Sequence, residues 1–291
     1  MKVTENDAPH HNPTNCHACS DGKYGAMLEL LETGVCAKWY VDELSHQVDG
    51  KFGPGDLRDV FICLNPVCKH IYRNYHGNSA DWHSSGYRQK QYDATSDESL
   101  YLGSPKVQVE RLMKVKRQAQ LMKPFMSKSD DIFEVASGKG YFLHVIKKDF
   151  PNIVGSDIDP KVISHNSIYN PDVKMVLSDV IKLPEDKKHD VVIAMDVLEH
   201  VENAREFANK MHALTKRYVI IQVPTKRYLK CPNDPSLQGG KEFDGHLHYF
   251  SRFSLNNLLT ENNMFKCVFM YESFPGSLAH GCELFSVYEK V

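Results

Sequence analysis

The stretch Asp131-Ile-Phe-Glu-Val-Ala-Ser-Gly-Lys-Gly-Tyr-Phe142 decides the fold of this 291-residue chain. An apolar run ends at an acidic residue, Glu134, and a short turn with Gly138 and Gly140 follows it. A helix-like run then extends from residue 141 to 148. A strand, a tight glycine turn and a helix in this order bring the backbone close to a nucleotide-like ligand. The spacing differs from the G-x-G-x-x-G of dinucleotide-binding proteins, so the sequence predicts a different ligand.

Strand-like and helix-like segments alternate on both sides of this turn. The expected strands are 132–136, 153–157, 173–177, 189–195 and 217–223, and the expected helices are 106–122, 141–149, 204–214 and one that begins at Pro160. A helix at 254–262 and two strands at 265–273 and 283–288, close enough to pair antiparallel, end the chain. This order predicts an α/β, Rossmann-like, doubly wound sheet of seven strands whose last hairpin is antiparallel.

The composition is that of an ordinary globular protein, with 42% hydrophobic and 25% charged residues. The net charge of −2 gives no basic field for nucleic acid. No apolar run approaches the roughly 20 residues that span a bilayer, and residues 1–15 lack the apolar core of a signal peptide. We therefore expect a cytoplasmic protein that is not in a membrane, with nucleic acid an improbable partner.

Acidic residues follow several of the expected parallel strands, at the sheet edge where ligands bind in open α/β folds. Asp157 lies about 20 positions past the glycine turn, which suits hydrogen bonds to ribose hydroxyls. Asp179, in Ser178-Asp179-Val180, is placed to meet an adenine amino group. A fourth segment, 195–201 with the sequence MDVLEHV, follows the next strand. For Asp157 and Asp179 the alternative is local turn hydrogen bonding.

These segments together resemble the ordered motifs of class I S-adenosylmethionine-dependent methyltransferases, over residues 106–291. The resemblance implies that the methionine part of the cofactor lies along Glu134, Ser137, Gly138 and Gly140, and that Ile158 packs on the adenine. It also implies that Asp157, Asp179 and Val180 belong to the cofactor site, and that Met195 and Asp196 close its pocket. One residue departs from the family pattern, because Ala136 occupies the position of the first glycine in E-x-G-x-G-x-G, and its methyl group could narrow the turn.

Two cysteine pairs, Cys16-His-Ala-Cys19 and Cys63-Leu-Asn-Pro-Val-Cys68, suit a structural zinc ion held by four thiolates. Three further residues could substitute as ligands: His17, Cys36 and His70. The alternative is that these are unrelated thiols in a small domain. A zinc ion held by four cysteines is coordinatively closed, so it should not activate water.

The expected domain organisation has four parts. Residues 1–15 form a disordered leader, 16–75 a zinc-ribbon-like module, 76–105 a linker or cap, and 106–291 the methyltransferase domain. An N-terminal module of this kind resembles that of small-molecule methyltransferases, among them sugar C-methyltransferases.

A hydroxyl acceptor of a methyl group needs a positioned base. The candidates are His246, His200 and His248, with Glu199 and Tyr249 in support. If 246–248 is extended, both histidines point to one face and line the pocket; otherwise they satisfy hydrogen bonds in a loop that covers the sheet. For Glu199 and His200 the alternative is a helix cap.

The segment Gly245–Ser251 resembles one found in sugar methyltransferases. The glutamate that C-methylating members carry before this segment's leucine is absent from Asp244-Gly245-His246. We therefore expect O-methylation of a saccharide or nucleotide-sugar hydroxyl, with a histidine as base. Two alternatives stay open: an RNA or protein methyltransferase that grips a polymer with the zinc module, and a non-catalytic cofactor-binding protein. The sequence does not determine the oligomeric state.

Overall fold

The structure is a computed structural model, and it describes residues 18, 24–26, 60–63, 70–73, 105–224, 247–273 and 283–291. Within these ranges no helix is long and apolar enough to cross a membrane.

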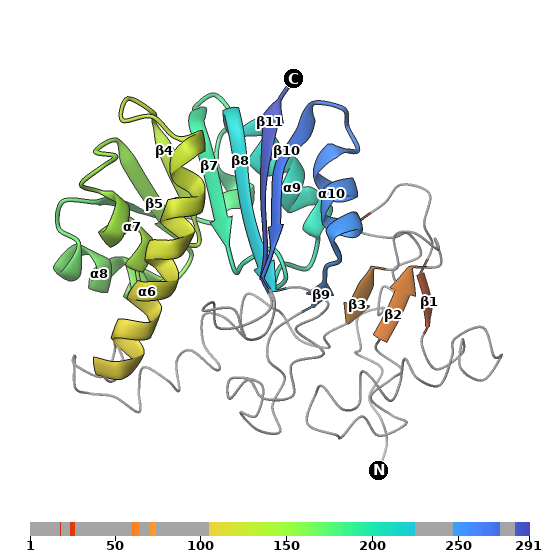
Figure 1. Cartoon of the computed structure of the whole chain (residues 1–291), viewed down its shortest axis with the longest axis horizontal. Coiled ribbons are helices and arrows are strands. Elements are labelled where there is room, and N and C mark those ends of the chain that lie inside the picture. Colours follow the sequence, from red (N-terminus) through yellow and green to blue (C-terminus); the bar gives the residue numbers. More distant parts are fainter. Residues whose placement is uncertain are drawn as a thin grey trace, which may run out of the picture.

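A seven-stranded sheet runs through the centre of the molecule (Figure 1) in the order β10-β11-β8-β7-β4-β5-β6. Its strands are β4 (Ile132–Val135), β5 (Ile153–Asp157), β6 (Lys174–Leu177), β7 (His189–Met195), β8 (Thr215–Pro224), β10 (Phe265–Glu272) and β11 (Glu283–Lys290). The five strands from β8 to β6 are parallel, and β11 pairs antiparallel with both β8 and β10. The predicted doubly wound sheet with an antiparallel last hairpin is confirmed.

Helices cover both faces of this sheet. They are α6 (Pro105–Met122), α7 (Tyr141–Ile146), α8 (Pro160–Tyr169), α9 (Ala204–Ala213) and α10 (Arg252–Thr260), with short 3-10 turns at η3 (Lys123–Phe125) and η4 (Val180–Lys182). On β7 the side chains alternate between two apolar clusters. Val191 and Ile193 pack with α6 and α7, whereas Val192 and Ala194 pack with α9 and α10. Because a strand presents successive side chains to opposite faces, this all-apolar run is buried on both sides.

A second, small sheet lies beside the main one and has the order β1-β2-β3-β9. Three of its strands come from the N-terminal region: β1 (Tyr24–Ala26), β2 (Val60–Cys63) and β3 (Ile71–Arg73). The fourth, β9 (His248–Tyr249), comes from the C-terminal part of the chain and pairs antiparallel with β3. Ala18 and Cys63 belong to the same apolar cluster as α9 and α10. The small sheet therefore joins the predicted N-terminal module to the larger domain.

Most element boundaries agree with the sequence prediction within a few residues. The helix after the glycine turn is shorter than expected, because it ends at Ile146 and not at residue 149. The next residues form a turn in which the amides of Asp149 and Phe150 both donate to the carbonyl of Ile146. This turn buries Phe150 against the core and directs the chain into β5. The predicted domain boundaries stay a prediction.

Candidate functional site

The glycine turn after β4 needs left-handed backbone at three of its residues. Ala136 has φ 52°, Gly138 has φ 53° and Gly140 has φ 68°. Glycine adopts this conformation without strain, but for alanine it costs about 1–2 kcal/mol. The residue that departs from the family pattern therefore lies at a position where glycine is the unstrained choice.

Two buried asparagines, Asn166 on α8 and Asn170 at its C-terminal end, hold this turn from outside. The Asn166 Nδ2 atom donates to the carbonyl of Gly138 at 2.7 Å, and Asn170 Nδ2 donates to the carbonyl of Gly140 at 3.3 Å. A Cβ atom on Gly140 would lie 1.8 Å from Asn166 Oδ1, so only glycine fits there. Sequence reasoning missed both asparagines, because their role depends on how α8 packs and not on any motif.

Glu134 and Ser137, both predicted to bind the methionine part of a cofactor, lie at the base of the turn. Ser137 ties the turn to β5, since its hydroxyl accepts from the Ser156 amide and donates to the carbonyl of Glu134. Glu134 is 3% exposed, and its Oε2 atom has no hydrogen-bond partner among the residues that the structure describes. Burial raises the pKa of the Glu134 carboxyl well above its usual range; Ser137 opposes the rise and Asp157 adds to it. A buried carboxylate oxygen of this kind suits a ligand that brings a hydrogen-bond donor.

The acidic residues at the ends of β5 and β6 are fixed by backbone amides. Asp157 accepts from the amide of Gly138 at 2.9 Å and from that of Asp159 at 3.0 Å. Asp179 accepts from the amide of Ile181 at 3.1 Å and lies 3.2 Å from the ammonium of Lys182. These bonds hold each carboxylate rigidly while leaving acceptor capacity on its oxygens.

A pocket of about 360 Å³ opens where the carboxyl ends of β4 to β7 meet. Six residues with predicted cofactor roles line it: Ala136, Asp157, Ile158, Asp179, Val180 and Asp196. Ile158 is 44% exposed, so its side chain offers apolar surface to the pocket. The other predicted cofactor residues, Glu134, Ser137, Gly138, Gly140 and Met195, are not among the lining residues.

The charge of this pocket is strongly one-sided. Five carboxylates line it, from Asp157, Asp179, Asp196, Glu202 and Glu206, and no lysine or arginine is among the described lining residues. Several lining residues were not singled out from the sequence: Val135, Ser156, Ile181, Glu202, Asn203, Glu206 and Phe207. The last four follow β7 closely along the chain, so the rule that ligands bind at strand ends could have found them.

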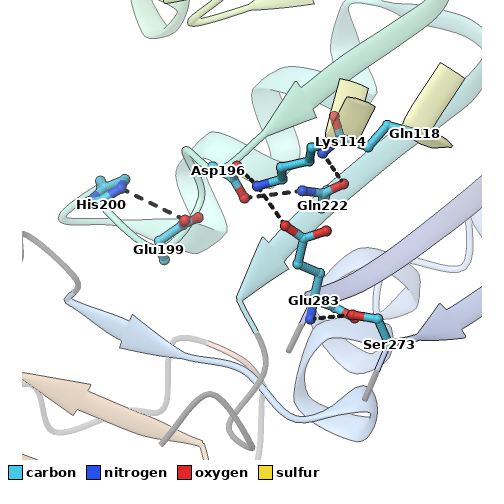
Figure 2. A network of polar contacts seen from close by, with 8 residues as sticks. All are labelled: Lys114, Gln118, Asp196, Glu199, His200, Gln222, Ser273 and Glu283. Carbon is cyan, nitrogen blue, oxygen red and sulfur yellow. Dashed lines mark hydrogen bonds and ion pairs between the residues drawn. The ribbon is translucent and has the colours of Figure 1, made fainter. Parts of the chain in front are cut away.

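Asp196 connects the pocket to a network of polar side chains, which Figure 2 shows. Its backbone is left-handed, with φ 52°. Its carboxylate lies 3.0 Å from the ammonium of Lys114 on α6 and accepts from Gln222 Nε2 at 3.3 Å. The same ammonium lies 2.5 Å from Glu283, and Gln118 donates to Gln222 at 2.7 Å. Burial alone would lower the pKa of Lys114, but the two carboxylates together raise it above its usual range.

The predicted catalytic histidines lie in different places. His200 lines the pocket, and its Nε2 atom is 3.7 Å from the buried carboxylate of Glu199. His246 lies outside the described residues. The structure therefore places His200 at the pocket, with Glu199 buried beside it and not among the lining residues.

His248 and Tyr249 are buried in β9 and are not among the lining residues of the pocket. A carbonyl only accepts, so His248 Nε2–H donates to the carbonyl of Val201 at 2.8 Å, and in the neutral ring Nδ1 accepts from His70 Nε2 at 3.1 Å. Both ring nitrogens are used in hydrogen bonds, one to His70 beside β3 and one to the segment between β7 and α9. This geometry favours the interpretation that His248 satisfies hydrogen bonds in a segment that covers the sheet. It disfavours a role for His248 as the base.

Of the four predicted zinc ligands, only Cys63 lies among the described residues. It is buried, and its amide donates to the carbonyl of His70 at 2.8 Å. Cys16, Cys19 and Cys68, and the possible substitutes His17 and Cys36, lie outside the described ranges. Within those ranges no group of three or more His, Cys, Asp or Glu side chains could hold a metal ion.

Comparison with known proteins gives the class of protein to which this fold and pocket belong. Residues 108–267 match a family model described as a methyltransferase domain. This match spans more than half of the chain, and the chain therefore belongs to that family and is a methyltransferase with the class I fold. No curated protein sequence matches the chain.

Solved structures support the same fold. The magnesium protoporphyrin IX methyltransferase from Synechocystis PCC 6803, with SAH bound, is 16% identical and has a TM-score of 0.55; the match covers 73% of this chain and 98% of that one. The plantazolicin methyltransferase BpumL, in complex with SAH, is also 16% identical with a TM-score of 0.55, over 73% of this chain and 93% of that one. At this level of identity the likeness concerns the fold.

Proposed function

We propose that the chain transfers the methyl group of S-adenosylmethionine to a hydroxyl of a small, saccharide-type molecule. The observation that carries the cofactor assignment is the charge of the pocket. Two of the five carboxylates, Asp179 and Asp196, have a lysine beside them, but no lysine or arginine is among the described lining residues. This negative excess disfavours the phosphates of a dinucleotide and favours a cationic nucleoside. S-adenosylmethionine has a sulfonium and an amino group, so it meets this requirement.

The residues present fit each part of this cofactor. Asp157 offers acceptor oxygens for the ribose hydroxyls, and Asp179 offers them for the adenine amino group. Ile158 and Val180, on the loops after neighbouring strands, provide apolar surface for the adenine ring. The buried Glu134 oxygen described above suits the amino group of the methionine part.

When bound, the cofactor supplies an electrophilic methyl carbon. The chain's part is to exclude water, align the acceptor hydroxyl and accept its proton. His200 lines the pocket and has Glu199 beside it to stabilise its protonated form. His200 and His246 are the two histidines that we propose as the base.

The acceptor class rests on the sequence resemblance and on the two structural relatives named above. Magnesium protoporphyrin IX and plantazolicin are both small molecules, which supports a small-molecule acceptor here. The absence of the C-methylating glutamate before His246 favours oxygen as the methylated atom.

A structural zinc ion held by Cys16, Cys19, Cys63 and Cys68 is also part of the proposal. The spacing of the two cysteine pairs supports this part of the proposal, and Cys63 is the ligand candidate that lies in the cluster shared with the larger domain. Metal analysis should find about one zinc ion per chain, lost in Cys63→Ser and retained in Cys267→Ser, a partly buried thiol on β10. Equal zinc content in both variants would remove Cys63 as a ligand.

Calorimetry with S-adenosylmethionine and with NAD⁺ tests the cofactor assignment. We expect binding of the first and none of the second. Asp157→Asn should weaken the affinity at least about tenfold, because it removes a charged acceptor of two hydrogen bonds. Asp172→Asn is the matched control, since Asp172 is exposed and lies before β6, at the opposite edge of the sheet. Tight NAD⁺ binding, or equal effects of both substitutions, would contradict the proposal.

A further inference from the structure

Asp196 lies at the methionine end of the pocket. Strands β4 and β7 are neighbours, and their register pairs Val135 with Ala194, so the loops that begin at Ala136 and Asp196 leave the sheet close together. Ala136 and Asp196 both line the pocket. Under the proposed function, the glycine turn holds the methionine part of the cofactor, which places Asp196 near the sulfur and not near the adenine.

The Asp196 carboxylate is oriented by two donors. Lys114 approaches one oxygen at 3.0 Å and the side chain of Gln222 donates to the other at 3.3 Å, while Gln118 fixes Gln222 in turn. The side chain of Asp196 nevertheless stays 43% exposed, so its negative charge acts on the pocket. Lys114 is shared with Glu283 at 2.5 Å, so one ammonium faces two carboxylates and offsets the charge of Asp196 only in part.

The reaction changes the charge at this end of the cofactor. The C–S bond breaks with its electron pair left on sulfur, a C–O bond forms, and the acceptor proton goes to the base. The sulfonium of the substrate carries a positive charge, whereas the thioether of the product S-adenosylhomocysteine carries none there. The adenine, ribose, amino and carboxylate groups are the same in both molecules, so only a group near the sulfur can distinguish them by charge.

We propose that Asp196 is the residue that makes the pocket prefer S-adenosylmethionine over S-adenosylhomocysteine. Lys114 is a positioning residue that fixes the carboxylate and limits its field. This assignment rests on the proposed function. A carboxylate beside the sulfur attracts the sulfonium and releases the neutral product more readily, and Lys114 keeps the attraction moderate so that the substrate is not held too tightly.

The test is the ratio of the two dissociation constants, measured by calorimetry at pH 8 with S-adenosylmethionine and S-adenosylhomocysteine. Asp196→Asn keeps the shape of the side chain, and asparagine tolerates left-handed backbone. It should weaken the affinity for S-adenosylmethionine about tenfold and the affinity for S-adenosylhomocysteine less than about twofold. Lys114→Met removes the offsetting cation and should shift the ratio the other way, toward a stronger preference for S-adenosylmethionine.

Asp179→Asn is the matched control. Its carboxylate serves the adenine end, which the two ligands share, so both affinities should fall together and the ratio should stay unchanged. If the ratio of the two dissociation constants stays at its wild-type value in both Asp196→Asn and Lys114→Met, the assignment is overturned, even if both ligands bind well. If the wild-type protein binds neither ligand, the proposed function fails instead, so the two failures are distinguishable.

Discussion

At the scale of single residues, Ala136 stands where the family pattern has glycine, and this difference has a structural consequence. The sequence identified it as the exception in the family pattern, and the structure gives it a φ of 52°. The cost is backbone strain, since the methyl group lies on a left-handed residue. The sequence alone could name the position but not the dihedral angle.

Ala136→Gly should therefore stabilise the protein, by about 0.5–1 kcal/mol after the greater entropy of glycine in the unfolded chain is subtracted. Urea unfolding measures this change. Ala208→Gly is the control, because Ala208 is buried in the right-handed helix α9. This substitution should lower the free energy of unfolding by at least about 1 kcal/mol. A loss of stability in both variants would mean that Ala136 is not strained.

Glu134 gives a pH dependence. Burial raises its pKa, so the folded chain keeps a proton that the unfolded chain loses above the usual glutamate range. The free energy of unfolding should therefore fall as pH rises from about 5 toward 8, on the order of 1 kcal/mol for each pH unit below the folded-state pKa. Glu134→Gln should remove this fall in the free energy of unfolding, and it should also weaken binding of the proposed cofactor.

Urea midpoints between pH 5 and pH 8 measure the effect. Glu185→Gln is the control, since Glu185 is mostly exposed and should leave the slope as in the wild type. A wild-type slope in the Glu134→Gln variant would show that this carboxyl ionises normally.

At the scale of elements, the glycine turn and α8 form one unit. The sequence predicted the turn and the helix separately, because each has a local signal: glycines in one case and Pro160 as a helix start in the other. The contact between them could not be predicted, since it depends on the packing of Asn166 and Asn170 against Gly138 and Gly140.

Two glycines of this turn should respond differently to alanine. Gly140→Ala should cost about 2–4 kcal/mol of stability, because the new methyl group meets the buried Asn166 side chain and the residue is left-handed. Gly138→Ala should cost only about 1 kcal/mol, since the nearest atom to its Cβ is 4.0 Å away. Thermal unfolding of both variants checks this, and equal losses would rule out the clash with Asn166.

At the scale of the whole molecule, the alternating pattern was enough to predict the main sheet. Strand β7 has the predicted bounds, because an all-apolar run between polar segments is a strong local signal. The joining of β3 to β9 was not predicted. Pairing between strands so far apart in sequence leaves no periodic trace, and the residues that carry it were interpreted as a candidate zinc ligand, His70, and a candidate base, His248.

His248→Ala should loosen this junction. The variant loses hydrogen bonds to Val201 and His70 and its packing between Tyr72 and Phe250. We expect a cost of about 1–3 kcal/mol, with faster hydrogen exchange in β3 and β9 and unchanged exchange in β4 and β7. His212→Ala is the control, because that buried histidine stacks on Phe265 at the start of β10 in the main sheet. Uniformly faster exchange in both variants would contradict a local role for His248.

The pairing of β3 with β9 also sets an order of events during synthesis. His70 and His248 are 178 positions apart. At about 5–20 residues per second, the ribosome therefore needs roughly ten to forty seconds after β3 to synthesise its partner strand β9. Throughout that interval the outer edge of β3 offers unpaired backbone groups to any other nascent chain. Slow codons between these points would lengthen this exposure, and a chaperone that covers the edge would shorten it.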